Sequence, residues 1–247
     1  MKILILSLFM CFSLFAQGKL EILFDDDWTP AKLNPFMEIK PSAGVTKNAN
    51  NKITAWASTT YNFAQSDTAL SPNWLSTEID FDSTDRMDLA DANAGSFDFG
   101  TNDFSVDFWV KTNQVSAGVR LLSKYLTVNP RWIISFNNGV VAFLLRDAVT
   151  STITTTATIK DNLWHHIAVI LDRNVGAYIY IDGSQSIKEE TTEWTDKVSL
   201  NVDNVAALSL GYSGSAEFYQ GQIFSIRAYL SALTPAQVLQ LYNYGRK

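Results

Sequence analysis

The chain has 247 residues, of which 47% are hydrophobic, and it carries a formal net charge of −6 at pH 7. This length and hydrophobic fraction allow a single domain with a substantial core. The negative charge argues against a nucleic-acid partner, because a protein that follows a phosphate backbone needs a basic surface.

The first 17 residues have the pattern of a secretory signal peptide. Lys2 precedes an apolar run over residues 3–15, and small Ala16 stands before polar Gln17. That run is shorter than the roughly 20 apolar residues that a membrane-spanning helix needs. We therefore predict that residues 1–16 are cleaved, that the mature chain has no transmembrane span, and that it is secreted or held at the cell surface.

Cysteine chemistry is not expected in the mature chain. The only cysteine, Cys11, lies inside the predicted signal peptide. Without it the exported protein has no disulfide, thiol nucleophile or thiolate metal ligand, so its stability must come from packing.

Residues 17–73 contain several prolines and an Asn-rich run, which predicts an irregular segment with an N-terminal strand and a long surface excursion. Within it, residues 52–56 and 61–63 have the pattern of short extended pieces. The chain then becomes rich in alternating apolar residues, which predict strands. Those strands are expected at residues 78–82, 87–89, 103–111, 120–123, 132–136, 140–145 and 150–159.

The segment WHHIAVILDRNVGAYIYIDG, residues 164–183, predicts two strands closed by a tight turn at Asp182 and Gly183. Alternate apolar residues place one face of each strand toward a core. These residues are Ile167, Val169 and Leu171 in the first strand, and Ala177, Ile179 and Ile181 in the second. The adjacent His165 and His166 point to opposite faces, so we expect one packed and one at the surface rather than a shared metal.

The C-terminal part predicts strands at residues 207–212 and 221–233, followed by a short helix. Thr234 suits the N-cap, Pro235 the first turn, and Gln237 completes a capping box. Val238 and Leu241 then fall on one apolar face at helical spacing.

Five segments in this order, FSVDFWVK, WHHIAV, YIYIDG, GQIFSIRAY and LTPAQVLQLY, resemble the laminin-G-like branch of the concanavalin A-like jelly rolls. The resemblance covers residues from about 74 to 244. It implies an all-β jelly-roll sandwich of two antiparallel sheets with a short C-terminal helix, forming one domain over residues 17–247. Members of this family are mostly binding modules.

Together with the predicted signal peptide, the resemblance implies an exported, non-catalytic module that recognises a glycan or a protein at a cell or particle surface. The alternative is a structural or attachment subunit of a larger surface assembly or phage virion. A glycoside hydrolase ranks third. These readings stay open at this point, because one fold hosts many activities.

The hydrolase reading rests on EIDFD at residues 78–82, which is similar to the Glu-x-Asp-x-Glu strand of laminarinase-like enzymes. On a strand, Glu78, Asp80 and Asp82 share one face, as a pair of catalytic carboxylates must. Asp82 is one methylene shorter than the family's last Glu. The segment also fits the Phe-Asp strand of the laminin-G-like domains, which argues against catalysis.

Calcium is the cofactor that the resemblance implies. Oxygen ligands suit it, and they could come from the acidic run at residues 25–27 or from Asp80, Asp82 and Asp85. However, the family's Ile-Asp-Glu on the last strand reads Ile-Phe-Ser at residues 223–225, so a solvated acidic turn is the favoured reading of each cluster.

A glycan site usually combines an exposed aromatic ring with polar groups. The alternative role for each aromatic residue is packing in the core. Tyr178 and Tyr180 alternate outward from their strand and are candidates on a sheet surface. The predicted ligand-binding residues, which cluster near turns, are Tyr125, Arg131, Trp132, Trp194, Tyr212 and Tyr219.

Overall fold

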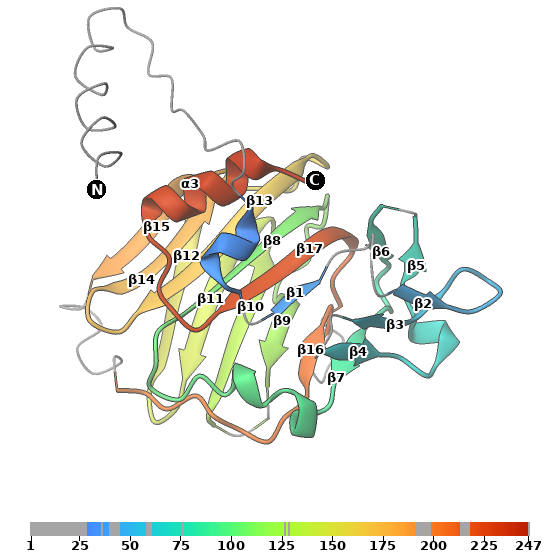
Figure 1. The fold of residues 1–247 in the computed structure, drawn as a ribbon, viewed down its shortest axis with the longest axis horizontal. Coiled ribbons are helices and arrows are strands. Elements are labelled where there is room, and N and C mark those ends of the chain that lie inside the picture. The colour runs from blue at the N-terminus through green and yellow to red at the C-terminus, as the bar shows by residue number, and fades with distance from the viewer. Residues whose placement is uncertain are drawn as a thin grey trace, which may run out of the picture.

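Two antiparallel sheets packed face to face make up the molecule, with one helix outside them (Figure 1). The computed structural model describes residues 29–35, 37–39, 45–57, 61–75, 77–125, 127, 129–190, 199–212 and 218–246. This architecture confirms the predicted all-β sandwich. Trp194, the acidic run at residues 25–27 and the predicted signal peptide lie outside the described residues.

The first sheet has eight strands in the order β15-β14-β13-β8-β17-β6-β5, and β1 pairs with β17 beside this path. Its strands are β1 (Met37–Ile39), β5 (Asn73–Trp74), β6 (Ile79–Phe81), β8 (Phe104–Lys111), β13 (Trp164–Asp172), β14 (Gly176–Ile181), β15 (Ser184–Glu190) and β17 (Gly221–Tyr229). Strands β13, β14 and β15 are consecutive, whereas β8 pairs with β13 and β17 from distant parts of the chain, as in a jelly roll.

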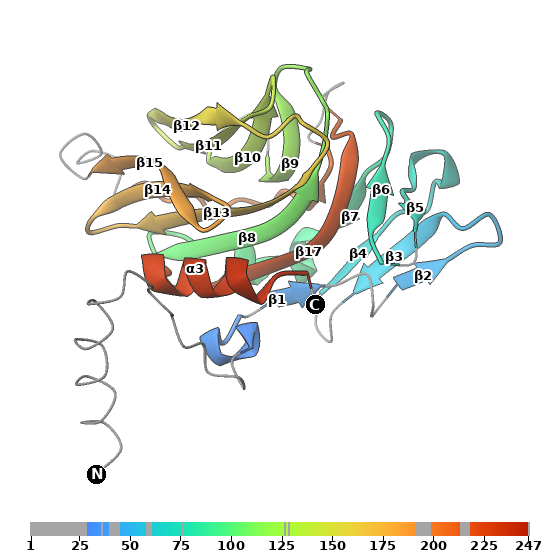
Figure 2. The same cartoon turned by 90° about the horizontal axis from the view of Figure 1, so that it is seen from above.

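The second sheet has nine strands in the order β12-β11-β10-β9-β16-β7-β4-β3-β2. They are β2 (Val45–Lys47), β3 (Ile53–Ala57), β4 (Asn62–Ala64), β7 (Met87–Leu89), β9 (Val119–Lys124), β10 (Arg131–Asn137), β11 (Val140–Arg146), β12 (Thr150–Thr158) and β16 (Leu208–Leu210). Figure 2 shows β9–β12 as one layer, β8 and β13–β15 as the next, and α3 (Pro235–Tyr244) outside the latter.

The main core lies between the sheets and follows the strand alternation read from the sequence. Phe104, Val106, Phe108 and Val110 of β8 are wholly buried. They meet β10, where the Trp132 indole N–H donates to the Phe97 carbonyl oxygen at 3.2 Å. The apolar faces predicted for β13 and β14 also belong to this core.

Two hairpins close on left-handed residue pairs, as predicted. Asp182 and Gly183 have φ of 53° and 75°, and Asn138 and Gly139 have φ of 55° and 81°. Two successive positive φ values match the twist of antiparallel strands. Gly183 is further constrained, because a Cβ there would lie 3.0 Å from the Leu239 side chain of α3.

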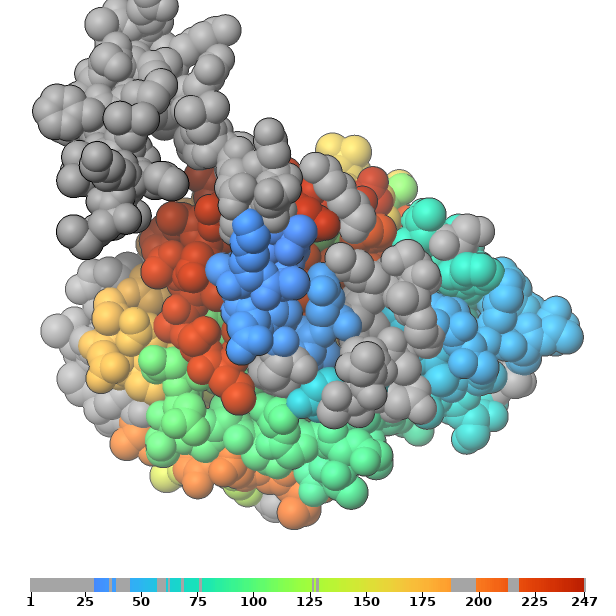
Figure 3. Space-filling model, in the orientation of Figure 1, coloured from blue at the N-terminus to red at the C-terminus, as the bar shows by residue number. Residues whose placement is uncertain are grey.

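Helix α3 covers the outer face of the eight-stranded sheet. Its capping box forms between Thr234 and Gln237, and Val238 and Leu241 are buried against the sheet. The short 3-10 helix η2 (Pro30–Leu33) and β1 lie beside it, seen as blue residues next to red ones in Figure 3. Within the described part of the chain, no helix is long and apolar enough to cross a membrane.

The packing under α3 corrects the expectation that Tyr178 and Tyr180 lie on an open sheet surface. They do point outward from the main core, but this face is covered. Tyr180 is 3% exposed and its hydroxyl donates to the Gln185 side chain at 3.2 Å. Tyr178 packs against the same apolar cluster.

A buried ion pair occupies the centre of this covered face. The Arg227 guanidinium donates to Asp107 at 2.6 Å, and the His166 ring nitrogen Nε2 lies 2.9 Å from the same carboxylate. His166 is therefore the packed member of the histidine pair, as expected. His165 keeps 15% of its side chain exposed, between Asp161 and Asp182.

The segment before residue 74 is more regular than predicted, and the surface excursion is wrong for most of its described part. Strands β3 and β4 match the two extended pieces. An N-terminal strand was expected without bounds, and β1 is the first described strand of the segment, whereas β2 and β5 were not foreseen. Ile53, Trp56 and Phe63 are wholly buried in the main core. This segment thus adds β2–β4 to the nine-stranded sheet and β1 and β5 to the eight-stranded one (Figure 1). The connection from Thr68 to Leu70 is a 3-10 turn, η3.

Candidate functional site

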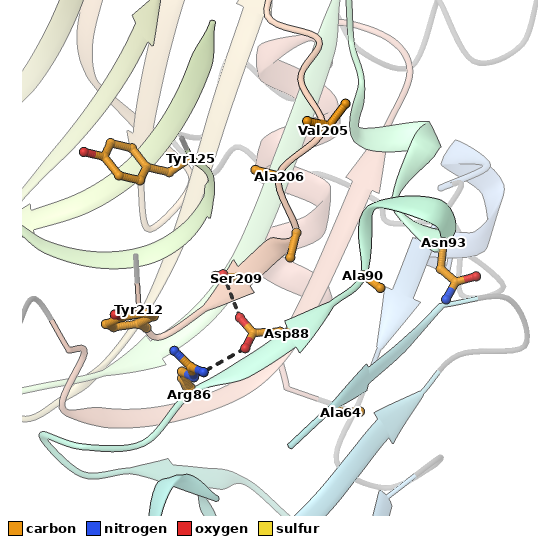
Figure 4. Close-up of a pocket in the computed structure, with 11 residues that line it drawn as sticks. Ala64, Arg86, Asp88, Ala90, Asn93, Tyr125, Val205, Ala206, Ser209 and Tyr212 are labelled. Carbon is orange, nitrogen blue, oxygen red and sulfur yellow. Dashed lines mark hydrogen bonds and ion pairs between the residues drawn. The ribbon is translucent and has the colours of Figure 1, made fainter. Parts of the chain in front are cut away.

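A groove of about 710 Å³ lies on the outer face of the nine-stranded sheet, over β4, β7 and β16. Its outward direction follows from alternation: Met87 and Leu89 of β7 are buried in the core, so Asp88 between them points away from it. Ser209 of β16 points outward for the same reason. Figure 4 shows these side chains near the centre of the groove, with the rings of Tyr125 and Tyr212 on one side of them.

The floor of the groove is a fixed set of polar groups. Ser209 and Asp88 are directly opposite in the antiparallel register, and the Ser209 hydroxyl donates to Asp88 Oδ1 at 2.7 Å. Arg86 Nε lies 3.4 Å from Asp88 Oδ2. The hydrogen bond from Ser209 orients the Asp88 carboxylate, and Arg86 adds an ion pair on its other side (Figure 4).

Two tyrosine rings border this floor. The Tyr212 ring stacks on Phe218 with centroids 4.7 Å apart, and the Arg86 guanidinium lies 4.8 Å from its centroid. On the Tyr125 ring, the guanidiniums of Arg120 and Arg131 lie at 4.1 and 4.9 Å. Such cation–π contacts hold each ring in a fixed position.

A buried lysine holds the two loops at the end of the groove. Lys124 of β9 is wholly buried, and its ammonium contacts Asp91 at 2.7 Å together with Asp98 and the Asn204 carbonyl oxygen. Asp91 belongs to the 3-10 turn η4 (Asp91–Asn93) and Asp98 follows η5 (Gly95–Phe97). Val205, next to Asn204, is 78% exposed at the rim.

Among the residues predicted from sequence, Tyr125 and Tyr212 come together at this groove. Arg131 is 9% exposed, behind the Tyr125 ring, where it also donates to the Thr127 carbonyl oxygen at 3.3 Å. A ligand-binding role for these three residues stays a prediction. Trp194 lies outside the described residues.

The assignment of Trp132 and Tyr219 as ligand contacts is wrong, because both rings are wholly buried. Trp132 packs between the sheets against Phe99, with centroids 5.4 Å apart. The Tyr219 ring packs against Phe136 at 5.6 Å, and its hydroxyl donates within the core to the Lys111 carbonyl oxygen at 3.3 Å. Neither ring has a face open to a ligand.

Sequence reasoning missed Arg86, Asp88 and Ser209. A signal for the first two was present, since they alternate with buried Met87 and Leu89 in the segment RMDL. Nothing local distinguishes Ser209, whose partner Asp88 is 121 residues away in the chain.

The carboxylates of the hydrolase reading lie elsewhere. Glu78, Asp80 and Asp82 do share one face, because Ile79 and Phe81 between them are buried. That face is the outer side of the eight-stranded sheet, away from the groove. Burial raises the pKa of Asp80, against the opposing effect of a hydrogen bond with Gln222.

The acidic turn after β6 does not fit a calcium site. Asp85 Oδ2 accepts the Asp82 backbone N–H at 2.8 Å, and Asp82 Oδ1 accepts the backbone N–H and hydroxyl of Thr84 at 2.8 and 2.7 Å. These oxygens serve the turn rather than converging on one point. Although burial acts to raise it, the hydrogen bonds from Thr84 hold the pKa of Asp82 below its ordinary value. The described residues contain no cluster of three metal-ligating side chains.

Comparison with known proteins identifies the fold independently. A family model described as the concanavalin A-like lectin/glucanases superfamily matches residues 81–239. In sequence, the chain is 28% identical to botulinum neurotoxin type X of Clostridium botulinum over 150 residues, which cover 58% of this chain and 11% of the neurotoxin.

Two solved structures have a similar fold. The binding domain of Paraclostridial Mosquitocidal Protein 1 matches with a TM-score of 0.61 and 17% identity, covering 84% of this chain and 51% of that one. The CBM40 module of Ruminococcus gnavus IT-sialidase, bound to α2,3-sialyllactose, matches with a TM-score of 0.52 and 17% identity, covering 61% and 87%. At 17% identity, these similarities show the fold of the chain.

Proposed function

Because the chain belongs to the concanavalin A-like lectin/glucanase superfamily, we propose that it is a non-catalytic module that binds a glycan in the groove between Tyr125 and Tyr212. The groove carries this proposal. Its volume of about 710 Å³ falls within the roughly 300–1,000 Å³ of small-ligand sites.

The chemistry of the groove suits a sugar. The apolar face of a sugar ring can lie on an aromatic ring, while its hydroxyls need donors and acceptors in fixed places. Tyr212 lines the groove at one border, with the Arg86 guanidinium over its ring. Asp88 and Ser209 supply an acceptor and a hydroxyl on the floor. The sialyllactose-bound CBM40 module supports this reading as a protein of similar fold that holds a glycan.

The described residues of the groove do not have the arrangement expected of a glycosidase. Retaining and inverting enzymes use two carboxyl groups that flank one bond. Among the described residues that line the groove, Asp88 is the carboxylate, and it is engaged with Ser209 and Arg86. This supports binding without catalysis.

The test is binding of the purified protein to a broad glycan array, followed by calorimetry with the strongest glycan. We expect Tyr212→Ala to weaken binding about tenfold, since an aromatic contact contributes about 1 kcal/mol beyond its buried area. Tyr244→Ala is the matched control, because it also removes a tyrosine side chain but from the last turn of α3, outside the other sheet. This variant should bind the glycan as tightly as the wild type does.

Equal affinity of Tyr212→Ala and wild type would contradict the groove as the site. Silence across the array would contradict glycan binding and favour the alternatives of a surface protein as partner or a structural role in an assembly. Thermal unfolding of each variant shows whether a loss of binding is a loss of the fold.

We also propose that binding occurs outside the cell, after cleavage following Ala16. The apolar run at residues 3–15 supports export. Expression of the full chain in a secreting host, with N-terminal sequencing of the product, tests this. A product that begins at Gln17 is the expected result, and retention of Met1 on the exported protein would contradict it.

A further inference from the structure

Two arginines lie over the Tyr125 ring on the outer face of the nine-stranded sheet, and a third is opposite one of them. The guanidiniums of Arg120 and Arg131 lie 4.1 and 4.9 Å from the Tyr125 ring centroid. Arg146 of β11 is directly opposite Arg131 of β10 in the antiparallel register. We call these three residues the arginine cluster.

Alternation places all three on the same side of the sheet. In β10, the core residue Trp132 follows Arg131, and in β11 the core residue Leu145 precedes Arg146. Side chains directly opposite in an antiparallel pair lie on one face, with Cβ atoms about 5 Å apart. Arg120 is likewise flanked in β9 by core residues.

This arrangement has an electrostatic cost. Like charges directly opposite each other destabilise a sheet. Burial lowers the pKa of Arg131, and the charges of Arg146 and Arg120 lower it further. The chain as a whole is acidic, with a net charge of −6, yet three of its seven arginines meet at this point. A bound anion would offset their repulsion.

The arginine cluster is continuous with the groove, because Tyr125 belongs to both. Its ring borders the cavity (Figure 4) and carries the guanidiniums of Arg120 and Arg131 against it. A guanidinium presents donors in a planar fork that matches a carboxylate or a sulfate oxygen pair. An acidic sugar lying in the groove could therefore direct its charged substituent to this end.

We propose that the arginine cluster recognises the anionic substituent of a saccharide, so that the ligand of the groove is an acidic glycan. This inference rests on the proposed function and adds the ligand's charge to it. The anion could be a carboxylate or a sulfate ester, which present similar oxygen acceptors.

The experiment uses glycan cores that are each presented in a neutral, a carboxylated and a sulfated form. The wild-type protein should bind one or both acidic forms at least about tenfold more tightly than the neutral core, as expected for charge-assisted hydrogen bonds. Raising the NaCl concentration from about 0.05 M to about 0.5 M should weaken binding of the acidic forms but not binding of the neutral cores. The acidic form that the protein binds more tightly shows whether the cluster recognises a carboxylate or a sulfate ester.

Arg146→Gln is the variant of choice, because Arg146 is half-buried at the end of its strand, whereas Arg131 is packed. It should lower affinity for the acidic form about tenfold or more and leave a neutral core unaffected. Arg146→Lys should recover part of the loss, since it keeps the charge without the planar fork. Lys160→Gln removes one charge near the Asn138 turn, at the other end of the β10–β11 hairpin, and should bind normally.

Equal binding of neutral and acidic forms would overturn this inference alone and leave glycan binding intact. So would an Arg146→Gln variant that folds and binds the acidic form as tightly as the wild type. If inorganic phosphate displaced the acidic glycan at an equal concentration, the arginine cluster would bind an adventitious ion only, and the inference would be overturned. Silence with every form would defeat the proposed function and this inference together.

Discussion

The buried carboxylate of Asp107 offers a demanding test of how the sandwich is held together. It accepts hydrogen bonds from Arg227 Nη2 at 2.6 Å and Nε at 3.0 Å, and from the Tyr229 hydroxyl at 3.2 Å. His166 Nε2 lies 2.9 Å away. Asp107→Asn keeps the shape of the side chain but removes its charge, so the 1%-exposed Arg227 is left inside without its ionic partner.

Removing one member of a buried ion pair costs about 3–5 kcal/mol, because an uncompensated charge remains in a poorly solvated place. Glu38, whose Oε1 is 3.7 Å from Arg227 Nη1, is 27% exposed and compensates only in part. We therefore expect Asp107→Asn to lower the free energy of unfolding by about 3 kcal/mol, a large share of the roughly 5–15 kcal/mol of a typical domain.

The pH dependence has a definite sign. Burial acts to raise the pKa of Asp107, but the Arg227 charge and the hydrogen bonds of Arg227 and His166 overcome it and lower the pKa to about 2. A depressed carboxyl pKa stabilises the fold above the unfolded value, which is 3.8 for this group, and that stabilisation disappears as pH falls through the folded value. The difference between wild type and Asp107→Asn should thus shrink from pH 4 toward pH 2.

Urea unfolding followed by tryptophan fluorescence measures both quantities. Asp161→Asn is the matched control, because this 49%-exposed carboxylate pairs with His165 at the surface and should contribute less than about 1 kcal/mol. If Asp107→Asn cost no more than Asp161→Asn at pH 7, or if the difference did not change below pH 4, the reasoning from the buried pair would be refuted.

Two further changes test other parts of the fold. Burial raises the pKa of Asp85 to about 6 from an ordinary 3.8, so the folded protein holds a proton that the unfolded chain has lost, and stability should fall as pH rises through this window. Asp85→Asn should abolish that fall and raise the free energy of unfolding by about 2–3 kcal/mol at pH 8, since each pKa unit corresponds to about 1.4 kcal/mol. A variant less stable than wild type in a urea titration at pH 8 would contradict this. Thr234→Ala removes the hydroxyl oxygen that accepts a hydrogen bond from the Gln237 backbone N–H at 3.3 Å. It should lower the free energy of unfolding by about 1 kcal/mol in the same assay, and Thr234→Ser should restore it. An unchanged urea midpoint for Thr234→Ala would count against the capping box.

The elements that the sequence predicted well are those with a strong local pattern. FSVDFWVK alternates over eight residues in β8, the Asp182-Gly183 pair has the residue types of a left-handed turn, and the capping box at Thr234 is a four-residue motif. Each depends on neighbours in the chain. By contrast, β1, β2 and β5 have two or three residues each, too few to show an alternating pattern, and they are strands because β17, β3 and β6 pair with them.

The candidate site divides in the same way. Tyr125 and Tyr212 were foreseen from their positions near turns, and both line the groove. Trp132 and Tyr219 were chosen on the same grounds, but both point into the core. Composition and local pattern do not tell which aromatic side chain faces the other sheet, because that depends on where the sheets pack.

The sequence by itself determined the class of the fold, most of its strands, the hairpin turns and the capped helix, since period-two alternation and turn residues act over a few positions. Tertiary structure alone decided which side chains share a surface. Asp88 meets Ser209 across 121 residues of chain, and Arg131 meets Arg146 only through the register of β10 and β11. A binding groove and an arginine cluster are properties of strand order and register, which no single segment of the chain contains.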